Sequence, residues 1–133
     1  MRLFVADSHT WTELTEGRAP TVRISAPDLA AARRKRAGIR SEDDTVSVIL
    51  DVVVAVAGDY RTARRGLEAA GADAAVRYVG TADGLAGLIA DISSAGVADG
   101  VTLLAGTPDQ EIRILGSDVL HRLQLRDHAR RAS

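Results

Sequence analysis

The sequence contains no cysteine, so disulfide bonds and thiolate metal sites are excluded. Its three histidines, His9, His121 and His128, are scattered without the spacing of a metal site. No apolar run approaches the roughly 20 residues that cross a bilayer, and the first apolar run is too brief for a signal peptide. We therefore expect a cytoplasmic protein with no bound metal and no membrane partner.

Aromatic rings and excess charge are scarce as well. Only four aromatic side chains occur in 133 residues, and 17 basic residues are balanced by 18 acidic ones. A formal net charge of −1 gives no global field that attracts nucleic acid, and so few rings offer little surface for stacking bases. We therefore predict no nucleic-acid partner. The hydrophobic fraction of 46% is typical of a chain that buries one core.

The pattern of apolar residues predicts alternating strands and helices. The segment 46–57 is apolar on both faces, which is typical of a strand in a parallel sheet covered by helices. Four principal strands are expected in all, at 2–6, 21–25, 46–57 and 100–104, with a shorter extended piece at 78–79. Helices are expected after each later strand, at 29–36, 59–70, 81–95 and 107–125.

Capping residues define where these helices begin and end. Ser25 is predicted to cap the first helix, with Pro27 and Asp28 in its first turn. Thr107 is predicted to cap the last helix, which would then begin at the following proline. Gly96 is a stop signal for the helix before it.

Repetition of strand and helix calls for a parallel sheet with right-handed crossovers. A complete βα barrel has eight strands and roughly 250 residues, whereas this chain has 133 residues. The sequence therefore predicts an α/β fold of parallel βα repeats that is either a small open sheet or half of a TIM-like barrel. We expect one half-barrel domain over 1–125 and a frayed polar tail over 126–133.

A tetrapeptide repeats at two loops that enter helices, as Gly80-Thr81-Ala82-Asp83 and as Gly106-Thr107-Pro108-Asp109. Free backbone N–H groups at such a helix start can hold a phosphate, and the last loops of βα barrels often do so. Capping alone also explains each of these residues. The sequence leaves both interpretations open and favours the caps.

Asp51 is a lone carboxylate inside the most apolar strand. A buried unpaired charge is costly, so the side chain needs a partner or a ligand. An ion pair with one of the many arginines, or a place at the rim of the sheet, is the simpler interpretation. A role in positioning a ligand hydroxyl or a flavin edge is the alternative.

Several segments together resemble the C-terminal half of the bacterial-luciferase-like, flavin-dependent monooxygenases. The motifs are the Ala-Asp-Ser at 6–8, the Ala-Pro-Asp-Leu-Ala helix start at 26–30, the Val-Gly-Thr at 79–81 and the Ala-Gly-Val-Ala-Asp-Gly-Val strand entry at 95–101. The resemblance covers about 2–125 and implies half of a βα barrel. The sequence departs from the family pattern at Ala6, where the family has glycine, at Trp11, where a small residue is usual, and at Pro20 and Ala82.

The resemblance implies association with a flavin, either FMN or a deazaflavin, whose phosphate corner would involve Ser8, Gly80, Thr81, Gly106 and Thr107. Ser8 is the best-matched of these residues. Family chemistry uses reduced flavin and oxygen, while the protein orients the flavin and excludes water. Most groups that line the flavin and substrate belong to the first half of the family barrel. The sequence therefore predicts a truncated oxidoreductase homologue with little or no autonomous monooxygenase turnover, and it identifies no catalytic residue.

A second hypothesis is a non-catalytic, self-associating half barrel that acts as a subunit or interaction protein without cofactor. A half barrel has open edges and an uncovered inner face, which invite pairing. We expect a homodimer or a larger homo-oligomer that joins inner face to inner face. A complementary half-barrel protein is the alternative partner, and a decayed gene fragment is a third possibility.

Overall fold

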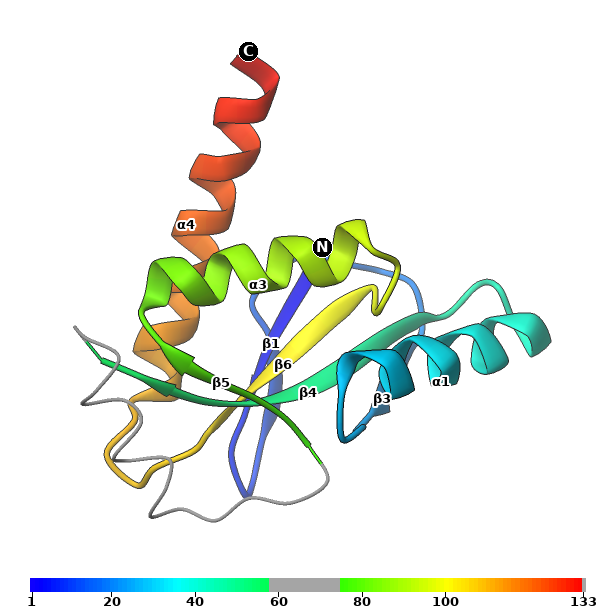
Figure 1. Ribbon diagram of the computed structural model, residues 1–133, viewed down its shortest axis with the longest axis horizontal. Helices are drawn as coiled ribbons and strands as arrows, with labels where there is room; N and C mark the ends of the chain where they lie inside the picture. The colour runs from blue at the N-terminus through cyan, green and yellow to red at the C-terminus, as the bar shows by residue number, and fades with distance from the viewer. Residues whose placement is uncertain (58–74, 133) are drawn as a thin grey trace.

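The computed structural model describes residues 1–57 and 75–132, so the helix predicted at 59–70 lies outside the described residues. In this part of the chain the strands form one sheet that curls like half of a barrel, and helices lie against one of its faces (Figure 1). The predicted α/β class and parallel βα arrangement are confirmed, and the curled sheet is compatible with a half barrel.

The strand order across the sheet is β2-β1-β6-β4-β3, and β5 also pairs with β4. All pairings are parallel except the hairpin of β1 and β2. The strands are β1 (Arg2–Ala6), β2 (Trp11–Glu13), β3 (Thr21–Ile24), β4 (Ser47–Val56), β5 (Val76–Gly80) and β6 (Gly100–Ala105). Because β3 pairs with the first part of β4 and β5 with its second part, these two strands share one side of β4.

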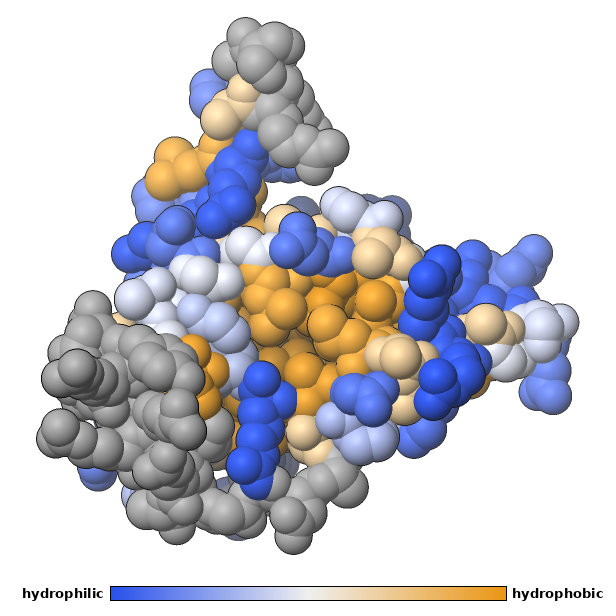
Figure 2. All heavy atoms as spheres, in the orientation of Figure 1, coloured by the Kyte–Doolittle hydropathy of each residue, from blue (hydrophilic) through white to orange (hydrophobic). Residues whose placement is uncertain are grey.

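The helices cover the outer face of the sheet, where the main core lies. They are α1 (Leu29–Glu42), α3 (Ala82–Ser94) and α4 (Ile112–Ala132). Alternate strand residues point toward them, among them Val5, Leu50 and Leu103, and each is at most 2% exposed. Figure 2 shows hydrophobic side chains gathered between α3 and α1. Burying a side chain of this size stabilises the fold by about 1.5 to 3 kcal/mol.

The predicted helix starts are correct for α3 and wrong for α1. Thr81 caps α3, because its hydroxyl accepts a hydrogen bond from the Gly84 N–H at 3.1 Å. Asp28, not Ser25, caps α1, because its carboxylate accepts the Ala31 N–H at 2.7 Å. The helix therefore begins at Leu29, after a bend at Pro27 and Asp28. Gly96 follows α3 with a φ of 69°, as its predicted role as a stop requires.

Helix α4 begins and ends later than predicted. Thr107 does not cap it; its carbonyl accepts the Gln110 N–H at 3.3 Å in a turn, and the helix starts at Ile112. The Gln110 side chain accepts the Val56 N–H at 2.8 Å, which holds this turn against the end of β4. The helix continues to Ala132, so residues 126–132, predicted to fray, are helical. In the described ranges, 1–57 and 75–132, no helix has the length and apolar character needed to span a membrane.

Candidate functional site

The inner, concave face of the sheet carries a cluster of aromatic and charged side chains. Strand alternation places Phe4 and Trp11 on this face, opposite the helices, and the parallel register adds Arg23, Asp51 and Thr102. These residues come from five different strands. The curl of the sheet brings them together although β2 and β3 lie at opposite ends of the strand order.

The cluster is a pair of stacked rings with a guanidinium group at each end, here called the inner-face stack. The rings of Phe4 and Trp11 stack with centroids 4.6 Å apart and an interplanar angle of 15°. The Arg2 guanidinium lies 5.5 Å from the Phe4 centroid, and that of Arg23 lies 5.6 Å from the Trp11 centroid. Because Trp11 belongs to β2 and Arg23 to β3, the stack reaches across the concave face.

A carboxylate neutralises each end of the stack. Asp51 binds the Arg23 Nε at 2.7 Å, so the ion pair with an arginine that the sequence favoured is confirmed. Glu13 accepts hydrogen bonds from the Arg2 Nε at 2.9 Å and the Arg2 Nη2 at 2.7 Å. This bidentate contact lowers the pKa of Glu13 to about 2, since burial opposes the shift only in part.

Thr102 anchors the middle of the stack to the sheet. Its side chain is fully buried, and its hydroxyl accepts a hydrogen bond from the Trp11 indole Nε1 at 2.9 Å. Thr102 also lies beside Asp51 in the register of β6 and β4. Trp11 as a whole is 38% exposed, so part of this residue is in contact with solvent.

The sequence did not predict this cluster. Two features of the sequence could have indicated it. Thr102 is the lone polar residue in the apolar segment 100–104, and Trp11 and Glu13 stand two residues apart, on one side of a short extended segment. The antiparallel return of β2 onto β1 was not predicted, because three residues are too few for a periodic signal.

The predicted phosphate-binding residues follow the carboxyl ends of parallel strands. Ser8 follows β1, Gly80 ends β5 and Thr81 follows it, and Gly106 and Thr107 follow β6. Because these strands run in the same direction, the residues lie along one edge of the sheet, the carboxyl edge. β6 lies next to β1, whereas β4 separates it from β5, so Thr81 lies farther from the other residues.

Most of these residues are already bonded within the chain. The Thr81 hydroxyl caps α3, and its carbonyl accepts the Tyr78 hydroxyl at 2.9 Å. The Gly106 N–H donates to the Val54 carbonyl at 2.8 Å. The space beside Gly80 and Gly84 is occupied by the Tyr78 hydroxyl, which a Cβ atom at either position would strike. These glycines therefore accommodate a tyrosine, and the space beside them is not open to a phosphate.

Acidic residues stand close in sequence to three of the predicted phosphate-binding residues. Asp7, Asp83 and Asp109 lie within two residues of Ser8, Thr81 and Thr107, respectively. The Asp7 carboxylate accepts the backbone N–H groups of His9 at 2.7 Å and Thr10 at 2.8 Å, which lowers the pKa of Asp7. An ionised carboxylate thus stays beside Ser8 at neutral pH. This carboxylate beside Ser8 and the occupied space beside Gly80 weigh against a flavin phosphate at these two positions.

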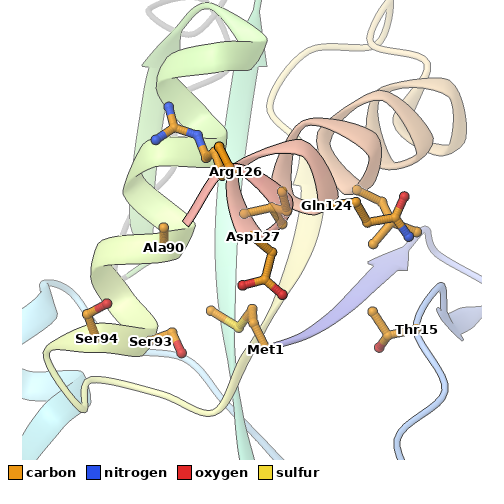
Figure 3. A pocket seen from close by; sticks show the side chains of 11 residues that line it. Met1, Thr15, Ala90, Ser93, Ser94, Gln124, Arg126 and Asp127 are labelled. Atoms are coloured by element: carbon orange, nitrogen blue, oxygen red, sulfur yellow. The ribbon is translucent and has the colours of Figure 1, made fainter. Parts of the chain in front are cut away.

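A groove between α3 and α4 has a volume of about 530 Å³ (Figure 3). Ala90 and Ser93 of α3 line one side, and Leu120 and Leu123 of α4 line the other. The Met1 side chain lies at its base, beside the amino end of β1. The groove is therefore away from the carboxyl edge.

Within 1–57 and 75–132, no three His, Cys, Asp or Glu side chains gather in a way that could hold a metal ion. No protein family and no curated protein matches this chain.

Proposed function

We propose that this chain is a non-catalytic half-barrel subunit that associates with a second copy of itself. The observation that carries the proposal is the inner-face stack, which fills the middle of the concave face with the chain's own side chains. In a βα barrel, ligands lie where loops and inward side chains converge at the carboxyl end of the strands. Here Trp11 and Arg23 occupy the inner face from opposite ends of the strand order.

A planar ligand that took the place of the Trp11 ring would have to displace the stack. That would break the Trp11–Thr102 hydrogen bond and leave the Thr102 hydroxyl buried without a partner, at a cost of about 1 to 3 kcal/mol. It would also separate a ring pair that contributes about 0.5 to 1.5 kcal/mol. These costs favour a packed inner face over a flavin pocket.

Self-association is supported by apolar side chains that remain in contact with solvent. Met1 is 43% exposed, Ile114 69% and Leu125 55%. The outer sides of β3 and β5 carry no further strand in the described part of the sheet. Exposed apolar groups and open parallel edges are features that proteins usually cover with another chain or element.

The proposal is tested by the native mass of the purified protein at about 10 to 100 µM. A dimer or larger homo-oligomer is the expected result, accompanied by one cooperative unfolding transition. A monomer over this whole range would overturn the proposal. A cooperative transition also argues against a decayed fragment, because such a fragment would lack a packed core. If a complementary half-barrel protein is the true partner, the purified chain will be monomeric and will fail this test.

A flavin-associated, luciferase-like half barrel is the second candidate function. It is favoured by Ser8 and Thr107, which follow the neighbouring strands β1 and β6 at the carboxyl edge, and by the first turn of α3, whose leading N–H groups have no helical carbonyl to bind. The test is a titration with FMN and with a deazaflavin, followed by flavin fluorescence. Saturable binding near micromolar, lost in Ser8→Ala and kept in Ser41→Ala on α1, would establish this function. Absence of binding up to millimolar flavin would exclude it.

A further inference from the structure

We infer that one flank of α1 is the self-association surface and that it binds the same flank of α1 in a second copy. The inference rests on the proposed self-association and specifies where it occurs. Figure 1 shows α1 at the end of the molecule opposite α4. Lys35, Gly38 and Glu42 on this helix are exposed, so the flank that carries them is accessible to a second chain.

A shallow hollow of about 360 Å³ lies along this flank of α1. It is lined by Lys35, Gly38, Ile39 and Glu42. These residues stand at positions i, i+3, i+4 and i+7 of the helix, so they form one stripe. The stripe has a charge of opposite sign at each end, and in its middle a glycine stands beside the half-buried Ile39.

Gly38 lies in the interior of α1, where no contact with a described residue requires a glycine. A Cβ atom at this position would meet nothing within 4 Å. Glycine in the interior of a helix destabilises it relative to alanine, because glycine loses more backbone entropy on folding. A missing side chain on an exposed helix does allow another helix to approach closely, since the distance between helix axes depends on the residues at the contact. The hollow is therefore suited to a helix.

A two-fold dimer places this stripe against itself. When the two-fold axis is perpendicular to α1, the two helices run antiparallel and cross between Gly38 and Ile39. Lys35 of each copy then lies opposite Glu42 of the other, and the symmetry forms this ion pair twice. The two glycines face each other and let the helices approach, while the two isoleucines pack together on one side of the crossing. Each residue of the stripe thus meets a suitable partner in a second copy.

The charged side chains at the ends of the stripe are available for this pairing. The ion pairs that α1 forms with described residues use Arg36 and Arg40. Lys35 donates a hydrogen bond to the Ser25 carbonyl at 2.6 Å, and its ammonium group keeps two further donors. The Glu42 carboxylate has neither a hydrogen bond nor an ion pair with a residue of 1–57 or 75–132. Both charges therefore lack an opposite charge in the described part of the single chain.

The charges on either side of the stripe favour the antiparallel arrangement. Arg33 and Arg34 precede it, and Asp43 and Asp44 follow it. In antiparallel helices the basic part of one copy lies beside the acidic end of the other, where opposite charges attract at low salt. A parallel arrangement would place like charges beside each other. The same chain therefore supplies a partner that is complementary in charge as well as in shape.

Native mass and dimer dissociation constants of charge variants test the pairing. A contact centred on one helix pair lies at the small end of protein interfaces, so we expect a dissociation constant in the micromolar range for the wild type. Lys35→Glu and Glu42→Lys each place like charges opposite each other twice, and each should raise the dissociation constant by about tenfold. The double variant restores opposite charges and should recover most of this loss. Ala37→Glu is the matched control, because Ala37 is exposed and lies about 150° around α1 from the middle of the stripe.

Gly38→Leu separates association from folding, because the two effects have opposite sign. In the single chain the leucine extends into open space and is the better helix former, so the thermal midpoint of the monomer should rise. In the dimer the leucine occupies the space where the helices meet and should raise the dissociation constant by about tenfold or more. Helical content and the unfolding midpoint of every variant are measured at a concentration where all are monomeric.

A wild-type dimer that Gly38→Leu or the single charge variants leave as tight as before overturns α1 as the interface and leaves the proposed function standing. A double variant that does not recover the affinity, or a dimer that Ala37→Glu weakens to the same extent, has the same meaning. A wild-type chain that stays monomeric at every concentration measured overturns both proposals.

Discussion

At the scale of single residues, Trp11 has the most influence on the inner face. It stacks on Phe4, contacts the Arg23 guanidinium and donates a hydrogen bond to Thr102. Trp11→Ala removes all three contacts and should lower the free energy of unfolding by about 2 to 3 kcal/mol, somewhat less than for a fully buried tryptophan because the ring is partly exposed. Urea unfolding measures the change. A variant as stable as the wild type would contradict a structural role for the stack.

The hydrogen bond can be separated from the ring contact. Trp11→Phe keeps a ring against Phe4 but leaves the fully buried Thr102 hydroxyl without its donor, and we expect a loss of about 1 to 2 kcal/mol. Adding Thr102→Val removes the unpaired hydroxyl and should recover about 1 kcal/mol. The double-mutant cycle is measured by urea unfolding. Additive effects of the two substitutions would show that the indole and the hydroxyl do not interact.

Glu13 makes the stability of the fold depend on pH in the acid range. Its pKa falls from 4.5 to about 2 through the hydrogen bonds from Arg2. A depressed carboxylate pKa contributes stability above the unfolded pKa, and that contribution is lost as pH falls through the folded pKa. We expect a loss of about 1 to 2 kcal/mol between pH 4.5 and pH 2. Glu13→Gln should make the free energy of unfolding depend less on pH between pH 4.5 and pH 2. A variant whose free energy of unfolding falls as steeply as that of the wild type would show that Glu13 is not the group responsible.

At the scale of elements, Asp99 joins α1 to the amino ends of two strands. Its carboxylate binds the Arg36 Nη2 at 2.9 Å and accepts the Val48 N–H at 2.8 Å. Burial raises the pKa of Asp99, but the hydrogen bonds from Arg36 and Val48 and the charges of Arg36 and Arg40 outweigh it, so the net pKa is lowered. A single carboxylate thus links α1, β4 and the start of β6.

Substitution of Asp99 tests this junction. Asp99→Asn keeps an acceptor for the Val48 N–H but loses the ion pair, so we expect a cost of about 1 kcal/mol. Asp99→Ala leaves the Val48 N–H and the Arg36 guanidinium without this acceptor and should cost about 3 kcal/mol. Thermal unfolding compares the two variants. Equal losses would show that the ion pair, and not the backbone acceptor, dominates the junction.

The sequence predicts an element well when the interactions that form it lie within a few residues, and poorly when they involve residues far along the chain. The strand at 47–56 and the Thr81 cap were predictable, because apolar alternation and a capping hydroxyl act within a few residues. The start of α4 was not, because Gln110 binds the Val56 N–H, a partner 54 residues away. The ion pair of Asp51 was predictable in kind, whereas the choice of Arg23 depends on the register of β3 with β4.

At the scale of the whole molecule, the curl of the sheet and the packing of the inner face depend on each other. Trp11 and Arg23 stand at opposite ends of the strand order and meet only because the sheet curls. The contact in turn resists flattening of the sheet. A half barrel that packs side chains of its own chain on its concave face can keep the stack without a second half.

The proposed self-association makes thermal stability depend on protein concentration. A partner that binds only the folded chain shifts the unfolding equilibrium by mass action, so the midpoint of the wild type should rise by about 3 °C over a hundredfold increase in concentration. Differential scanning calorimetry measures the midpoint at each concentration. A midpoint that does not change with concentration would show that folding and association are uncoupled, which would contradict the proposal.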